Sequence, residues 1–103
     1  MVEEKKEKIV NLFGLARKAK SIAFGKKAVK KSVFCKKTHL IFSGKSDNNF
    51  VKYISPICEN EKIQISYLFS DEELEKIFGR RKLTVISIVD NNFTKGIKQI
   101  LGK

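Results

Sequence analysis

Apolar residues recur along this chain with the spacing of helices in some segments and of strands in others. Residues 3–19 carry apolar side chains at helical spacing and acidic ones in the first turn, which predicts an amphipathic helix. Gly14 lies inside it, where a missing side chain would let another backbone approach. The same spacing predicts further helices over residues 26–34, from a cap at Ser46 and Asp47 to about Asn60, from Ser70 to Gly79, and after Asp90.

Runs of β-branched and aromatic residues lie between these helices. They predict strands or extended segments at Ser21–Phe24, Thr38–Phe42, Ile63–Phe69 and Leu83–Val89. Because helices and strands alternate throughout, we expect one α/β domain over residues 1–103, with helices layered on both faces of a small, at least partly parallel sheet. Leu15 and Tyr53 fall on the apolar faces of their helices, and Pro56 is expected to kink or divide the helix that contains it.

Local signals mark the ends of two helices. Ser70 is followed by Glu73 at the spacing of a capping box, and Gly79 stands where a left-handed residue would end the helix. Asp90 is expected to cap the last helix with its carboxylate.

The net charge of +11 is concentrated in one part of the chain. Residues 8–46 hold eleven basic side chains and no acidic one, so the remaining residues balance to zero. Segregated positive charge of this kind is typical of proteins that bind nucleic acid. An acidic protein partner or an anionic membrane surface would also accept it.

The stretch over residues 25–32 concentrates this charge further. As a helix with about 100° per residue, it places Lys26, Lys27, Lys30 and Lys31 within about 140° of arc and leaves the opposite face for packing. Neighbouring lysines on a helix repel one another by a few tenths of a kcal/mol per pair, so solubility alone does not favour this arrangement. Positive charge beside the free N–H groups of a helix start suits phosphate.

The chain carries no catalytic or metal-binding motif. His39 has no second ligand residue at a metal-binding spacing, and Cys35 and Cys58 form no CxxC pair, so both cysteines are expected to be buried, reduced thiols. The acidic residues from Asp71 to Glu75 are explained by a helix start. We therefore expect neither an enzyme nor a cofactor, a metal or a small-molecule substrate.

Hydropathy argues against a membrane protein. No apolar run approaches the length of a membrane span, and the charged N-terminal residues are unlike a signal peptide. The sequence therefore predicts a cytoplasmic protein with no membrane partner.

Three segments, taken together, resemble a known family. They are Leu12–Ala19 with a short link to Phe24, Gly25–Lys31 with a strand at Thr38–Ser43, and Leu74–Gly79 before the strand at Leu83–Val89. In order and spacing they resemble the kink-turn-binding ribosomal-protein family, the L7Ae superfamily, and most of all its small bacterial YlxQ-type members. The resemblance covers nearly the whole chain.

This resemblance implies a three-layer α/β/α sandwich with a mixed four-stranded sheet, and binding to kink-turn or related structured RNA. It also implies that the glycine turn and the first helical residues enter the RNA, with Lys31 matching a family lysine, and that a loop before the last strand covers the RNA. With Lys30 added from the cationic face, the candidate RNA-binding residues are Gly25, Lys26, Lys27, Ala28, Lys30, Lys31, Gly79, Arg80, Arg81 and Lys82, in a loop that reaches Leu83.

Two departures from the family pattern change the expected mode of binding. Well-studied kink-turn binders read sheared G·A pairs with an Asn-Glu pair, where this chain has Lys27 and Ala28. Its loop carries Arg80, Arg81 and Lys82 where apolar residues are usual in those binders. Alanine cannot accept a hydrogen bond from guanine, and lysine offers charge without a fixed fork. The sequence therefore favours contacts with phosphates over base-specific reading.

Three functional hypotheses remain open at this point. In the first, the protein is a free binder of structured RNA. In the second, it is a component or accessory factor of the ribosome, with ribosomal RNA as its partner. In the third, it is a protein-interaction module whose basic face meets an acidic partner.

Overall fold

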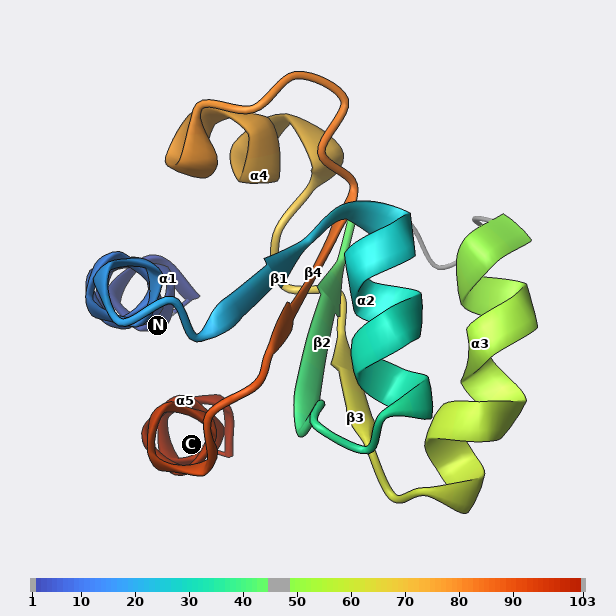
Figure 1. The fold of residues 1–103 in the computed structure, drawn as a ribbon. Helices are drawn as coiled ribbons and strands as arrows, with labels where there is room; N and C mark the ends of the chain where they lie inside the picture. The colour runs from blue at the N-terminus through green and yellow to red at the C-terminus, as the bar shows by residue number, and fades with distance from the viewer. Residues whose placement is uncertain (1, 45–48, 103) are drawn as a thin grey trace.

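The structure is a computed structural model that describes residues 2–44 and 49–102. Within these ranges helices and strands alternate, as the sequence pattern predicts (Figure 1). The elements are α1 (Val2–Lys18), β1 (Ile22–Phe24), α2 (Gly25–Phe34), β2 (Leu40–Ser43), α3 (Asn49–Asn60), β3 (Gln64–Ser66), α4 (Asp71–Phe78), β4 (Val85–Ile88) and α5 (Asn91–Leu101). The predicted cap at Ser46 and Asp47 lies outside the described residues.

The four strands form one mixed sheet in the order β1-β4-β2-β3. β4 is antiparallel to both of its neighbours, whereas β2 and β3 are parallel. The carboxyl ends of β1, β2 and β3 therefore meet the amino end of β4 at one edge of the sheet. The starts of α2 and α3 and the loop from α4 to β4 all lie at this edge.

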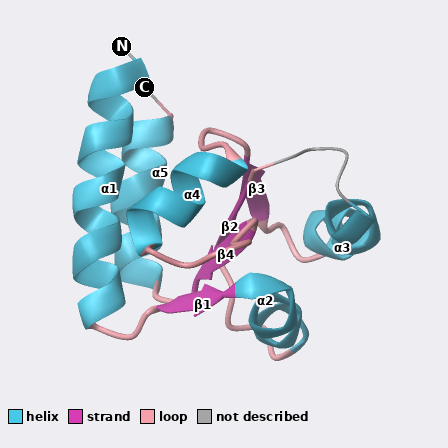
Figure 2. Ribbon diagram, turned by 90° about the horizontal axis from the view of Figure 1, so that it is seen from above, coloured by secondary structure: helices cyan, strands magenta, loops and turns pink. Residues whose placement is uncertain are grey.

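Helices cover both faces of the sheet (Figure 2). On one face, Leu40 and Phe42 of β2 pack with Phe13 of α1 and Ile97 of α5 in a core cluster that also takes in α4. On the other face, Ile41 of β2 packs in a second cluster with residues of α2 and α3. Alternate residues of β2 thus serve opposite clusters, as the pleat of a strand requires. The predicted three-layer α/β/α sandwich with a mixed four-stranded sheet is confirmed.

Phe13 is the centre of the larger cluster. Its ring contacts those of Phe42, Phe69 and Phe78, with centroids 5.1, 5.5 and 5.3 Å away. Phe13 and Phe42 meet edge to face, a geometry that aromatic quadrupoles favour. Helix α4 is therefore held to α1 and the sheet through aromatic contacts, which fixes where the loop after α4 begins.

The predicted strand at Ile63–Phe69 is wrong beyond Ser66. The chain leaves the sheet after β3 because Phe69, buried to 1% exposure, turns into the aromatic cluster beneath α1 instead of staying in the strand plane. The strand predicted at Leu83–Val89 is also shorter, as Val85–Ile88. One backbone hydrogen bond continues the pairing of β4 with β1 beyond the strand ends, from the Val89 N–H to the Ser21 carbonyl at 2.9 Å.

Helix α3 runs through Pro56 as one element, so the expected division does not occur. Proline has no N–H to donate to the carbonyl of Lys52, one turn earlier in the helix. Lys52 is exposed, so water can donate a hydrogen bond to this carbonyl instead. Among the described residues, no helix has the length and apolar character needed to cross a lipid bilayer.

Two residues expected on the apolar faces of helices are exposed, and a close backbone approach expected at Gly14 is not found. Leu15 and Tyr53 are 55% and 52% exposed, because each lies at the border of its helix's apolar stripe and not at its centre. Gly14 receives no neighbouring backbone, since a Cβ built there would meet nothing within 4 Å.

Candidate nucleic-acid interface

Helix α2 separates its charged and buried residues as predicted. Lys26, Lys27, Lys30 and Lys31 are all exposed, whereas the buried residues of the helix are Val29, Ser32 and Val33. Ala28 is half-buried between the two faces. The four lysines therefore form one cationic surface that faces solvent.

A buried hydroxyl cluster holds the other face of α2 on the sheet. Ser32 Oγ hydrogen-bonds Thr38 Oγ1 and lies 3.0 Å from Ser87 Oγ of β4, while it donates to the Val29 carbonyl at 2.7 Å. Because hydrogen bonds are directional and this cluster is buried, it sets the rotation of α2 about its axis. The lysines are thereby directed away from the sheet.

The start of α2 has no side-chain cap. Phe24 occupies the N-cap position in an extended conformation, and no side-chain hydrogen bond caps the helix. By contrast, Ser70 caps α4 and Asp90 caps α5 with their side-chain oxygens, as predicted. The first turn of α2 also contains no acidic residue. Free N–H groups and the positive end of the helix dipole are thus left for an external anion.

Gly25 makes the direct step from β1 into α2 possible. Its φ of +85° lies in the left-handed region, where side chains bring the Cβ close to the backbone. A Cβ at this position would meet no atom within 4 Å, so the requirement for glycine comes from the backbone conformation and not from space.

Strand pairing brings the second predicted segment to the same place. Phe24 at the end of β1 is paired with Ile86 at the start of β4, so the loop that leads into β4 reaches the start of α2. Phe24, directly before α2, makes two contacts with the segment that leads into β4. Its ring centroid lies 5.2 Å from that of Phe78 and 4.2 Å from Arg80 Cζ.

Hydrogen bonds to Glu75 of α4 fix the backbone of the loop after this helix. Gly79 ends the helix with a φ of +63°, as predicted, and the Arg80 N–H donates to the Glu75 carbonyl at 3.2 Å. The Lys82 N–H donates to the Glu75 carboxylate at 3.1 Å. Leu83 then enters the core at 5% exposure. The three basic side chains between these anchors, of Arg80, Arg81 and Lys82, remain exposed.

Together these segments form one surface, which we call the basic edge. It consists of the exposed side chains Lys26, Lys27, Lys30, Lys31, Arg80, Arg81 and Lys82. The structure thus brings the start of α2 and the loop from Gly79 to Lys82 together at one edge of the sheet, and Lys30 and Lys31 continue this surface along α2 toward its carboxyl end.

Other basic residues of the charged segment lie elsewhere. A helix of the length of α2 spans about 15 Å, so the exposed Lys36 and Lys37 beyond its carboxyl end lie away from the start of α2, although Lys37 lines a pocket together with Lys31. Arg17 and Lys18 end α1, before β1 begins, and are also remote from the start of α2. Lys45 lies outside the described residues.

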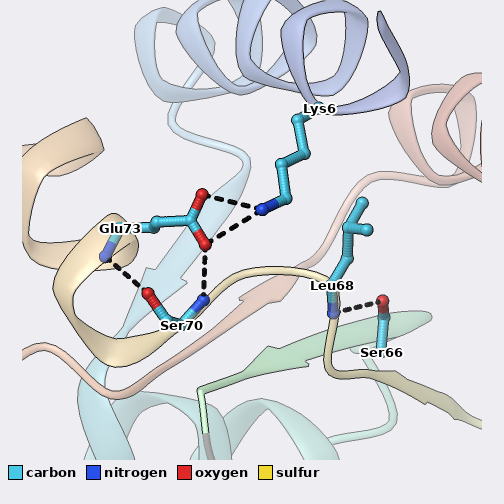
Figure 3. A network of polar contacts seen from close by, with 5 residues as sticks. All are labelled: Lys6, Ser66, Leu68, Ser70 and Glu73. Carbon is cyan, nitrogen blue, oxygen red and sulfur yellow. Dashed lines mark hydrogen bonds and ion pairs between the residues drawn. The ribbon is translucent and has the colours of Figure 1, made fainter. Parts of the chain in front are cut away.

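An ion pair joins α1 to α4. Lys6 of α1 contacts both carboxylate oxygens of Glu73, the closer at 2.9 Å, and Glu73 also accepts from the Ser70 N–H (Figure 3). The Ser70 N–H first, and Lys6 second, hold the pKa of the Glu73 carboxyl below its usual value. This capping box confirms the prediction and links α4 to α1.

No group of three or more His, Cys, Asp or Glu side chains in residues 2–44 and 49–102 is placed to hold a metal ion. Cys58 is buried, and burial raises the pKa of its thiol, but the predicted burial of Cys35 is wrong. Cys35 follows the last residue of α2 and is exposed there.

Sequence reasoning missed two residues that organise the basic edge. Phe24 supports Arg80, and Glu75 fixes the backbone of Lys82. The position of Phe24 directly before the glycine turn was the available signal for its role. Glu75 gave no separate signal, because its charge is equally explained by the helix dipole.

Comparison with known proteins tests these conclusions. A profile of the ribosomal protein L7Ae/L30e/S12e/Gadd45 family matches residues 7–98. The chain belongs to this family. The match runs from α1 into α5 and therefore includes every segment of the basic edge. The closer assignment to the YlxQ-type members stays a prediction.

Solved structures of other proteins share the L7Ae fold of this chain. A protein with unknown function from Bacillus halodurans C is 22% identical, with a TM-score of 0.80 over 93% of this chain and 98% of its own. The 15.5kD RNA binding protein of Giardia lamblia is 19% identical, with a TM-score of 0.76 over 96% of this chain and 86% of its own. No curated protein matches the sequence.

Proposed function

We propose that this protein binds structured RNA, of the kink-turn kind, on the basic edge, and that residues 1–103 act as a single binding domain without enzymatic activity. The observation that carries the proposal is the contact between Arg80 and Phe24, which joins two basic segments far apart in the sequence into one surface. Membership in the L7Ae family and likeness to a Giardia protein described as RNA-binding support it.

The chemistry of the basic edge favours phosphate over base contacts. Its exposed side chains are Lys and Arg, which donate to phosphate oxygens, and the uncapped start of α2 adds backbone N–H donors. Ala28 offers no side-chain polar atom at the position where related proteins read a base pair. The protein would therefore recognise the shape of a bent RNA backbone. The bend would bring phosphates into contact with both α2 and the loop after α4.

The test is equilibrium binding to a kink-turn hairpin and to a continuous duplex of equal length, measured between 50 and 200 mM salt. We expect tighter binding to the kink-turn RNA. With six phosphate contacts, its affinity should fall on the order of a thousandfold across this range. Equal affinity for both RNAs would contradict structure-specific binding. No binding to either RNA, with binding to an acidic protein that survives nuclease, would replace RNA with a protein partner.

We further propose that the protein acts in the cytoplasm with the translation machinery, where ribosomal RNA would be its partner. This proposal rests on the ribosomal membership of the family. Co-sedimentation with ribosomal subunits at moderate salt is the expected result. A protein that stays in the supernatant while it binds isolated kink-turn RNA would instead be a free RNA binder.

A further inference from the structure

Tyr53 is an exposed aromatic residue that the sequence places in the core. Its side chain is 52% exposed on α3, and Lys30 Nζ of α2 lies 5.3 Å from the centre of its ring. This cation–π contact links the tyrosine directly to one of the basic-edge lysines. The ring is therefore held in place while about half of the residue remains open to solvent.

Topology places Tyr53 beside the basic edge. Strands β1 and β2 point the same way, so α2 and α3, which follow them, both begin at the edge where the loop to β4 lies. Figure 1 shows the two helices side by side, running in the same direction from this end. Tyr53 lies in the first half of α3, level with Lys30 near the middle of α2.

The charge around Tyr53 suits an anion. Lys52 is exposed beside it, and the first turn of α3 contains no acidic residue. The acidic side chain of α3 itself, Glu59, lies in the last turn of the helix. Acidic residues lie instead beside the loop after α4, where Glu72 and Glu75 line a pocket with Arg80 and Arg81. The lack of acidic residues in the first turns of α2 and α3 therefore extends the cationic surface from one helix to the next.

We propose that Tyr53 is a stacking platform for an unpaired nucleotide of the bound RNA, whose flanking phosphates contact Lys30 and Lys52. This inference rests on the proposed function. Any of the four bases can stack on a tyrosine ring, so stacking does not require a particular RNA sequence. This agrees with a surface that contacts phosphates and not base edges. Because Lys30 already orients the ring, little side-chain freedom is lost when the base arrives.

Tyrosine fluorescence tests the stacking directly. The chain has two tyrosines and no tryptophan, so the Tyr67→Phe variant emits from Tyr53 alone. Titration with the kink-turn hairpin, corrected for absorption by the RNA, should quench this emission and saturate with the binding curve. The continuous duplex, which has no unpaired nucleotide, should leave the emission largely unchanged.

Affinity measurements complete the test. Tyr53→Ala should weaken binding of the kink-turn hairpin by about 5- to 150-fold, the range for loss of one stacked base, and Tyr53→Phe should restore it. The salt dependence of Tyr53→Ala should match the wild type, whereas Lys30→Ala should lower the salt slope by about one. Leu15→Ala is the control, because Leu15 is 55% exposed on α1, which packs on the other face of the sheet.

The outcomes separate this inference from the proposed function. If the wild-type protein binds the hairpin but Tyr53 is not quenched and Tyr53→Ala binds equally well, the stacking platform is wrong and RNA binding stands. If Leu15→Ala loses as much affinity as Tyr53→Ala, the effect is not specific to Tyr53 and the inference is also wrong. If the wild type binds neither RNA, the proposed function fails and this inference with it.

Discussion

The guanidinium carbon of Arg80 lies 4.2 Å from the centre of the Phe24 ring, across a gap of more than fifty residues in the sequence. Phe24 is the N-cap residue of α2, and Arg80 is the first basic residue after α4. The contact therefore fixes the loop relative to the helix start before any RNA arrives. A surface arranged in advance loses less conformational entropy when it binds.

Replacing Arg80 should affect both stability and binding. Arg80→Ala removes the cation–π contact and is expected to lower the free energy of unfolding by about 0.5–1 kcal/mol. Arg81→Ala removes the same charge from an exposed neighbour that makes no ring contact within the described residues, so its unfolding free energy should stay unchanged. Urea denaturation of both variants measures the difference. Equal stabilities would show that the Arg80–Phe24 contact does not hold the loop.

Two glycines should respond to alanine in opposite directions. Gly25→Ala forces a side chain into the left-handed region and should lower the free energy of unfolding by about 1–2 kcal/mol. Gly14→Ala adds a methyl group in an exposed part of α1, where nothing lies within 4 Å, and should raise it by about 0.5–1 kcal/mol. Thermal or chemical unfolding tests both. A change of the same sign in the two variants would contradict the assigned role of the turn.

The ion pair between Lys6 and Glu73 should make stability depend on pH at the acidic end. Because the pKa of Glu73 is lower in the folded chain than in the unfolded one, its charge stabilises the fold above the unfolded pKa of about 4.3. That contribution is lost as the pH falls through the lowered pKa. Glu73→Gln keeps the capping spacing without the charge, so it should be less stable than the wild type at pH 7 and equal to it in strong acid.

Glu72→Gln is the control for this pH series. Glu72 is exposed in the same first turn and contributes neither the capping-box hydrogen bond nor the ion pair with Lys6. The stability difference between Glu72→Gln and the wild type should therefore vary less with pH, as unfolding in buffers from pH 7 to 2 would measure. A difference for Glu73→Gln that persists unchanged at pH 2 would contradict the pKa argument.

The features that could be predicted from the sequence are those set by local spacing. The alternation of elements and the two faces of α2 follow from which positions are apolar, and the Ser70 capping box and the Gly79 helix end follow from residues a few places apart. Each depends on interactions within one segment. The resemblance to a family then supplied the sandwich architecture, which the structure and the family profile confirm.

Features that depend on contacts between distant segments could not be predicted in this way. The Arg80–Phe24 contact requires the pairing of β1 with β4, and the early end of β3 requires the aromatic cluster that draws in Phe69. The exposure of Tyr53 depends on how α3 rotates against α2. Helical periodicity places this residue near the edge of an apolar stripe, but only tertiary packing decides on which side of that edge it lies.

The central claim is that the basic edge, and not the overall positive charge, binds RNA. Two double variants test it most directly, because Lys27→Glu with Lys31→Glu and Lys8→Glu with Lys95→Glu change the net charge equally on exposed residues, the first pair on α2 and the second on α1 and α5 at the other face of the sheet. The measurement is the dissociation constant for the kink-turn hairpin at one fixed salt concentration. The Lys27 and Lys31 pair should lose affinity on the order of a hundredfold, whereas the Lys8 and Lys95 pair should change it by less than about threefold. Equal losses in the two variants, or full affinity in the Lys27 and Lys31 variant, would contradict the account.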